Sequence, residues 1–141
     1  MLYTIGFSGH TAEQFFSILK ENKVKRVIDI RLYNTSQMAG FAKKEDLKYL
    51  LKTMSIYYHH ILKLAPSKEL FSDYKNKIID WKQYVKIFNT SLNKIKIENE
   101  IGLVDLEDSC LLCAEFYPQQ CHRRLVAEYF KNTFGIEVKH L

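Results

Sequence analysis

Short apolar runs alternate with amphipathic helical patterns along the chain, and this alternation restricts the fold more than any other feature. The apolar runs predict strands at residues 2–5, 27–30, 56–59, 110–114 and 136–140. Apolar residues that recur three and four positions apart predict helices at residues 12–19, 43–54, 81–95 and 125–130. Because strands that alternate with helices are typical of a three-layer α/β/α sandwich, we expect a mostly parallel sheet of about five strands.

Two stretches carry no regular pattern. Residues 32–40 are polar and predict a loop, whereas residues 63–80 mix lysine, serine and aspartate with one proline and predict no defined element. The start of the first helix is clearer, because Thr11 followed by Gln14 fits a capping box.

The composition is that of an ordinary globular domain. The 141 residues fit a single α/β domain spanning residues 1–141, and 47% of them are hydrophobic. This balance excludes a disordered tail, a collagen-like repeat and a disulfide miniprotein. The opening residues lack a basic segment followed by an apolar one, and no apolar run reaches about eighteen residues. We therefore expect a cytoplasmic protein that does not bind membranes.

A modest positive charge permits an anionic partner without requiring one. Lysine and arginine number 21 against 16 aspartates and glutamates, which gives a net charge of +5. An anionic small molecule or a nucleic acid is therefore a candidate partner. Nothing in the pattern fixes the oligomeric state.

Polar side chains gather where the predicted strands end. In a parallel sheet, sites lie where the carboxyl ends of the strands meet the starts of helices. The polar residues at this edge come from three separate segments and are Ser8, then Asp29, Arg31 and Ser36, then Cys113, Glu115, Cys121, His122 and Arg123. Their convergence favours a ligand site.

We expect Cys121, Glu115 and Asp29 to carry the chemistry. Pro118 suits a helix start, so Cys121 should lie in or just before the first turn, where the helix dipole and Arg123 would lower the pKa of its thiol. Cys121 is then a nucleophile or a stabilised thiolate, Glu115 an acid or a base, and Asp29 the group that orients an arginine. The residues expected to bind the ligand are Ser8, Arg31, Ser36, Cys113, His122 and Arg123.

Other interpretations of the same residues stay open. Glu115 could form a buried ion pair with Arg31 or Arg123, in which case the cluster is structural. Cys113 and Cys121 could form a reversible disulfide, because both are predicted at one junction of strand, loop and helix.

Two further sites are tested by residue spacing. A phosphatase-like cysteine loop needs an arginine six positions after the cysteine, where this chain has Ala127. A zinc site made of Cys113, Cys121 and His122 lacks a fourth ligand, and neighbouring residues on a helix point about 100° apart. We therefore expect no metal and no other cofactor.

Three segments resemble a known family. TIGFSGHTAEQF at the start, VIDIR at the second strand and CAEFYPQQCHRRLVAEYF near the last helix are similar to the motifs of the domain of unknown function family 488. The resemblance implies a small α/β fold and carries no established activity. It singles out Gly6, Ser8, Asp29, Arg31, Ser36, Phe41, Cys113, Glu115, Pro118, Cys121, His122 and Arg123.

The chain also departs from the family pattern. Phe7 stands where the family usually has a histidine, and Gln37 where it often has an arginine. The loss of that loop arginine weakens any phosphate binding by the loop. Pro66 ends a segment that often reads Leu-Gly-Gly, and it should stiffen the chain there.

Two functions of different classes follow from these residues. The first is a ligand or catalytic site at the carboxyl ends of the strands that acts on an anionic ligand related to nucleotides or nucleic acids. The alternative is a non-catalytic binding module or a thiol-based redox-regulatory module.

Overall fold

A five-stranded sheet lies at the centre of the computed structural model, which describes residues 1–35 and 40–141. The strand order is β3-β2-β4-β1-β5, and every neighbouring pair is parallel. The strands are β1 (Leu2–Gly6), β2 (Arg26–Asp29), β3 (Tyr57–His60), β4 (Ser109–Cys113) and β5 (Val138–His140). The predicted sheet is confirmed, and it is wholly rather than mostly parallel.

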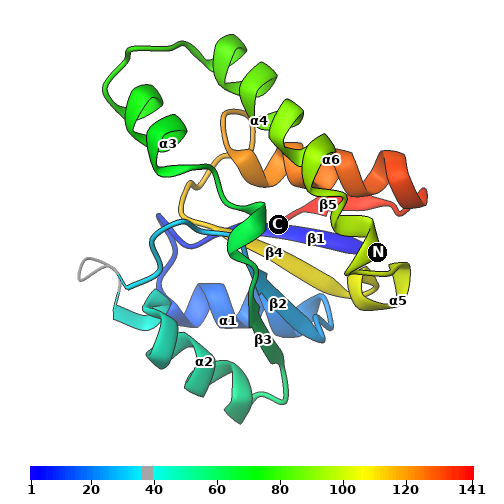
Figure 1. The fold of residues 1–141 in the computed structure, drawn as a ribbon. Helices are drawn as coiled ribbons and strands as arrows, with labels where there is room; N and C mark the ends of the chain where they lie inside the picture. Colours follow the sequence, from blue (N-terminus) through cyan, green and yellow to red (C-terminus); the bar gives the residue numbers. More distant parts are fainter. Residues whose placement is uncertain (36–39) are drawn as a thin grey trace.

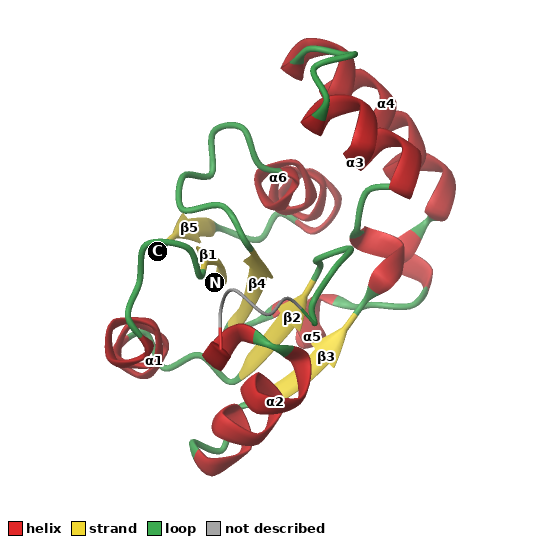
Figure 2. Ribbon diagram, turned by 90° about the vertical axis from the view of Figure 1, so that its left-hand side faces the viewer, coloured by secondary structure: helices red, strands yellow, loops and turns green. Residues whose placement is uncertain are grey.

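Helices cover both faces of this sheet (Figure 1). They are α1 (Ala12–Glu21), α2 (Lys44–Thr53), α3 (Lys68–Lys75), α4 (Trp81–Ile95), α5 (Leu103–Leu106) and α6 (His122–Phe134). Figure 2 separates the layers, with α1 and α2 on one side of the sheet and α4 and α6 on the other. Each face has its own apolar core, which includes Phe15 and Leu47 on the first face and Phe88 and Leu125 on the second. The α/β/α sandwich is thus confirmed.

Local signals in the sequence explain where several helices begin. The Thr11 side chain accepts from the backbone N–H of Gln14, and the Gln14 side chain accepts in return from that of Thr11, so the predicted capping box is present. Asp80 and Gln83 form the same reciprocal pair at the start of α4. No helix in the described ranges is both long and apolar enough to cross a membrane.

The segment at residues 63–80, for which the sequence predicted no defined element, contains α3. Ser67 caps this helix by accepting a hydrogen bond of 3.1 Å from the backbone N–H of Leu70. A helix of 8 residues repeats its apolar positions too few times for a periodic pattern to stand out. Figure 1 shows α3 and the start of α4 extending beyond the sheet, on the same side as α6.

The ends of β1 and β4 mark a topological switch point of the sheet. These strands are neighbours, and Gly6 pairs with Cys113 at their carboxyl ends. The chain leaves β1 toward α1 on one face of the sheet and leaves β4 toward α6 on the other. Ligands of open parallel sheets commonly bind near such a switch point, at the carboxyl ends of the strands.

Candidate functional site

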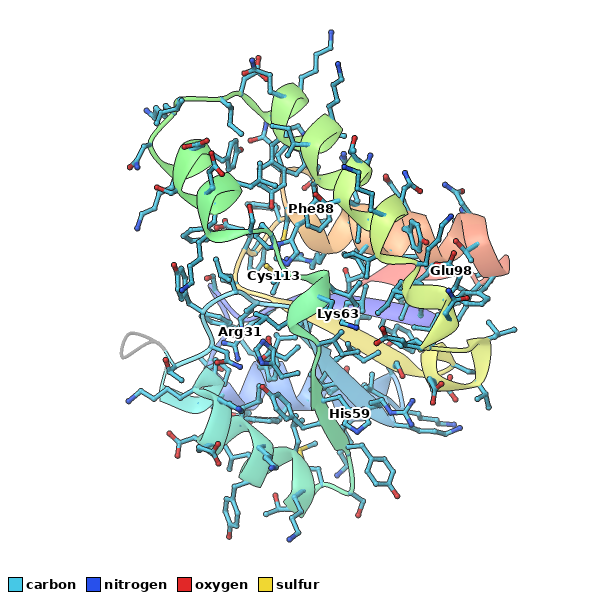
Figure 3. The ribbon with its side chains drawn as sticks, in the orientation of Figure 1. Arg31, His59, Lys63, Phe88, Glu98 and Cys113 are labelled. Atoms are coloured by element: carbon cyan, nitrogen blue, oxygen red, sulfur yellow. The ribbon has the colours of Figure 1, made fainter. Side chains whose placement is uncertain are left out.

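A cavity of about 690 Å³ opens beside the carboxyl ends of β2 and β4. Cys113 at the end of β4 and Cys121 and His122 at the start of α6 line its buried part. Arg31, which follows β2, lines another side, and residues of α3 and α4 complete it. In Figure 3, Cys113 lies near Arg31 at this edge, with Phe88 of α4 above both in the view.

Two thiols and an imidazole form a buried group that we call the cysteine–histidine cluster (Cys113, Cys121 and His122). Their sulfur and nitrogen ligand atoms all lie within 4.8 Å of one another, and Cys113 Sγ is 3.5 Å from His122 Nδ1. His122 Nε2 lies 2.7 Å from the carbonyl oxygen of Ile30. Since a carbonyl can only accept, Nε2 carries the proton and Nδ1 presents its lone pair to the thiols.

Cys121 occupies the position that the sequence predicted, just before the first turn of α6. It is the N-cap, with an extended backbone at φ −133° and ψ 138°, and the helix begins at His122. All three cysteines of the chain are unbonded thiols, so the structure contains no disulfide between Cys113 and Cys121.

The two cluster thiols differ in acidity. A hydrogen bond from Cys121 holds the pKa of Cys113 below its ordinary value against the effect of burial, and the backbone N–H groups of Ala114 and Glu115 act in the same direction. That hydrogen bond, together with burial, raises the pKa of Cys121. The prediction of a lowered pKa at Cys121 is therefore wrong, because Cys121 is the donor of the pair and Cys113 the acceptor.

Asp29 holds Arg31 in place beneath the cavity. Arg31 donates from Nε to Oδ1 at 2.9 Å and from Nη2 to Oδ2 at 2.8 Å, and the Tyr58 hydroxyl donates to Oδ2 at 2.6 Å. The side chains of Asp29 and Arg31 are 0% and 4% exposed. Burial raises the pKa of Asp29, but the hydrogen bonds and charge of Arg31 outweigh it, so that the pKa lies below its usual range. Asp29 itself does not line the cavity.

Arg123 is fully buried and binds the loop between β4 and α6. Its Nη1 donates to the carbonyl oxygen of Glu115, its Nη2 donates to that of Phe116 at 2.9 Å, and its Nε donates to Thr4 Oγ1 at 3.3 Å. The sequence predicted a ligand-binding role for this residue. In the structure all three nitrogens bond to the protein itself, and the side chain does not line the cavity.

Glu115 is exposed and lines the cavity. Its carboxylate takes part in no ion pair or hydrogen bond within the described part of the chain. The interpretation of a buried Glu115–arginine pair is wrong, because Arg31 pairs with Asp29 and Arg123 bonds to backbone carbonyls.

Of the two serines predicted to bind the ligand, one lies outside the cavity and the other lies outside the described residues. Ser8 is exposed after β1, its backbone N–H donates to the carbonyl oxygen of Ala114 at 3.0 Å, and it does not line the cavity. Ser36 lies outside the described residues.

Sequence reasoning missed the side of the cavity that faces α3 and α4. We call this side the aromatic wall, and it consists of Tyr33, Phe71, Tyr74, Trp81 and Tyr84. Tyr33 packs edge-on to Phe71 with ring centroids 5.3 Å apart, and Trp81 stacks on Tyr84 at 5.0 Å. Trp81 and Tyr84 belong to the apolar positions that predict the helix at residues 81–95, and these positions alone do not indicate a cavity. The dense run of aromatic residues between positions 71 and 84 was the available signal.

Gly6 is required by the close approach of the loop after β4. A Cβ atom at this position would lie 1.6 Å from the carbonyl oxygen of Glu115, which is impossible without moving the backbone. The resemblance singled out Gly6, and the structure supplies the physical reason for a glycine there.

A comparison with known families matches the part of the chain that contains the cluster. The family model described as "Domain of unknown function DUF488" matches residues 11–130, a range that includes β2 and the whole segment from Cys113 to Arg123. The comparisons with curated proteins and with solved structures gave no match. The chain therefore belongs to the DUF488 family, whose function is unknown.

Proposed function

We propose that the cavity binds a small anionic ligand that carries a flat ring, with a nucleotide or a nucleic-acid end as the class that combines both features. We propose further that Glu115 acts on this ligand as an acid or a base. The observation that carries the proposal is that one cavity contains both a fixed buried arginine and an aromatic wall.

The aromatic wall and Tyr117 supply flat surfaces for stacking. Tyr117 is 71% exposed and Tyr33 is 55% exposed, yet both line the cavity. Rings left open to solvent beside a cavity suit stacking on a base, because every base has a flat π face.

Two cations favour an anionic group on the ligand. Arg31 uses Nε and Nη2 on Asp29, while its Nη1 makes no hydrogen bond within the described residues and remains available as a donor. Lys75, at the end of α3, is exposed and also lines the cavity. Since Asp29 fixes the Arg31 guanidinium, little side-chain entropy is lost when a phosphate or carboxylate binds to it.

Glu115 is the only carboxylate among the described residues that line the cavity. Because it has no partner there, its oxygens are free to exchange a proton with a ligand. Glu115→Gln should therefore leave the melting temperature unchanged and abolish turnover while binding persists. Unchanged turnover in this variant would contradict the assigned role.

Calorimetric titration tests the binding proposal. The probes are nucleoside mono-, di- and triphosphates and short single-stranded oligonucleotides. Tyr117→Ala should weaken binding by about 5- to 150-fold, since a stacked ring contributes about 1–3 kcal/mol. Tyr57→Ala is the matched control, because Tyr57 is 69% exposed on β3 and lies outside the cavity.

A second pair of variants tests the anionic group. Lys75→Ala should weaken binding about two- to fivefold, whereas Lys68→Ala, which is exposed on the same helix and outside the cavity, should not. Failure of every probe to bind, or equal affinities within both pairs of variants, would refute the proposal.

The proximity of the Cys113 and Cys121 sulfur atoms, which lie within 4.8 Å of each other, favours a second candidate, a redox-responsive thiol pair. Oxidised glutathione should then convert the pair to a disulfide that peptide mapping assigns to these two residues and that thioredoxin reduces. A mixed disulfide on a single cysteine, with no bond between the two, would exclude this candidate.

A further inference from the structure

We propose that the cysteine–histidine cluster binds one zinc ion through Cys113, Cys121 and His122, and that the fourth position of the metal opens into the cavity. This site is independent of the ligand proposed above. It assigns to the buried part of the cavity a metal that the sequence alone gave reason to exclude.

The separations of the donor atoms suit tetrahedral zinc. With Zn–S bonds of about 2.3 Å and a Zn–N bond of about 2.1 Å, a tetrahedral ion sets roughly 3.6 Å between sulfur and nitrogen and roughly 3.8 Å between two sulfurs. Cys113 Sγ and His122 Nδ1 are 3.5 Å apart, and no pair of donors in the cluster is more than 4.8 Å apart. The metal-free cluster therefore needs at most a rotamer-scale adjustment to close around an ion.

The backbone at Cys121 removes the objection that consecutive residues chelate poorly. That objection assumes that both residues are helical, which would separate their side chains by about 100°. Cys121 instead has an extended backbone as the N-cap of α6, and only His122 is helical. The bend at the helix start turns the Cys121 thiol toward the imidazole, so that neighbours in sequence become neighbours in the cluster.

The imidazole is already oriented as a ligand. Metal-binding histidines generally donate their other ring N–H to a carbonyl or a carboxylate, which fixes both the tautomer and the ring. His122 makes this bond from Nε2 to the carbonyl oxygen of Ile30 at 2.7 Å. The ring edge also packs against Phe88, with centroids 5.7 Å apart, so the orientation of Nδ1 is fixed from two sides.

The positive charge of Arg123 beside the cluster favours the thiolate form of its cysteines. Arg123 is fully buried, and no carboxylate lies within ion-pair distance of it in the described ranges. Its Nη1 lies 3.8 Å from Cys121 Sγ. A buried guanidinium needs a negative partner, and a metal-bound thiolate supplies one. Two thiolates also neutralise the charge of a Zn²⁺ ion, so the bound metal would add no net charge to the cluster.

The donor set selects both the metal and the kind of site. Thiolate and imidazole ligands suit zinc, whereas magnesium and calcium require oxygen ligands. Only three donors converge in the described part of the chain, and all three line the cavity beside Glu115. Structural zinc sites use four protein ligands, whereas three ligands with an open position are typical of catalytic sites.

Metal analysis of the reduced, folded protein tests this inference. After incubation with zinc and gel filtration, wild type should retain one zinc per chain. The variants Cys113→Ala and Cys121→Ala should lose it. Cys110→Ala is the matched control, because Cys110 is buried with the apolar core on the opposite face of the sheet. Cobalt added to the metal-free wild type should give sulfur-to-cobalt charge-transfer absorption and the strong d–d bands of a tetrahedral ion.

Alkylation of wild type provides a second measurement that does not depend on whether the variants fold. Zinc should protect Cys113 and Cys121 from iodoacetamide, and a chelator should restore their reaction. Wild type that retains no zinc, zinc retained equally by the Cys113→Ala and Cys110→Ala variants, or a cobalt spectrum without thiolate absorption would each overturn the proposal. Nucleotide binding by the metal-free protein would leave the proposed function intact, so the two proposals can fail separately.

Discussion

Replacing Arg31 with methionine removes the cationic half of a buried ion pair while keeping most of its apolar stem. The change leaves the Asp29 carboxylate 0% exposed, with hydrogen bonds from Tyr58, Asn34 and the backbone N–H of residue 31 but without the two from the Arg31 side chain. It also removes the contact of the guanidinium with the Phe7 ring, which lies 5.3 Å away.

The expected loss of stability is large, because Asp29 would remain a buried charge without the opposite charge of Arg31. Removal of one partner of such a pair destabilises a protein by about 3–5 kcal/mol. The stability of a domain is typically about 5–15 kcal/mol, so the Arg31→Met variant should still fold. With an m-value of about 2 kcal/mol/M, its urea midpoint should fall by about 2 M.

Removal of the charge on Asp29 should then rescue the variant. In Asp29→Asn/Arg31→Met the amide keeps the shape of the carboxyl and leaves no buried charge, so the double variant should regain at least about 2 kcal/mol over Arg31→Met. Urea unfolding at pH 7, followed by circular dichroism, measures both differences. Lys25→Met is the control, because its ion pair with Asp108 is exposed and should shift the midpoint far less. The reasoning fails if Arg31→Met costs no more than this control, or if the double variant is no more stable than Arg31→Met.

Two further predictions concern the same edge of the sheet. Because the pKa of Asp29 is depressed in the folded state, the stability that this carboxylate contributes is present above its unfolded pKa and is lost as pH falls through the folded value. The free energy of unfolding should therefore decline below about pH 4, and this decline should be shallower in Asp29→Asn; parallel pH profiles would contradict the assignment. Gly6→Ala should cost about 2 kcal/mol or more, since its Cβ would lie 1.6 Å from a carbonyl oxygen of the loop after β4. Gly40→Ala is its control, because no atom of the described residues lies within 4 Å of the added atom, and equal urea midpoints for the two variants would show that the approach at Gly6 is not tight.

Periodicity predicted the sheet and the helices of the sandwich because both depend on repeated local patterns. The short apolar runs correspond to β1 to β5, and the capping box at Thr11 and Gln14 lies at the start of α1. Local patterns of this kind do not predict the order of the strands in the sheet. β4 inserts between β1 and β2, and this position is set by packing between distant segments, which no local pattern records.

The site could be predicted only as a set of residues near one edge. The sequence predicted that Cys113, Cys121 and His122 lie at that edge, and in the structure they form one cluster. Spacing could not show that Arg123 turns inward to the loop while Glu115 turns outward to the cavity, because both are charged residues that ordinarily prefer solvent. The direction of each side chain depends on the path of the loop after β4.

The loop after β4 explains why Arg123 occurs in the same motif as Cys113 and Cys121. Its backbone carbonyls at Glu115 and Phe116 accept from Arg123, which also bonds to Thr4 on β1. The guanidinium thus ties the loop to the sheet and fixes the distance between the strand end that carries Cys113 and the helix start that carries Cys121. A lysine cannot replace it, because a single ammonium group cannot reach three acceptors in this planar arrangement. Substitution of Arg123 should therefore disturb the separation of the two thiols before it disturbs the aromatic wall.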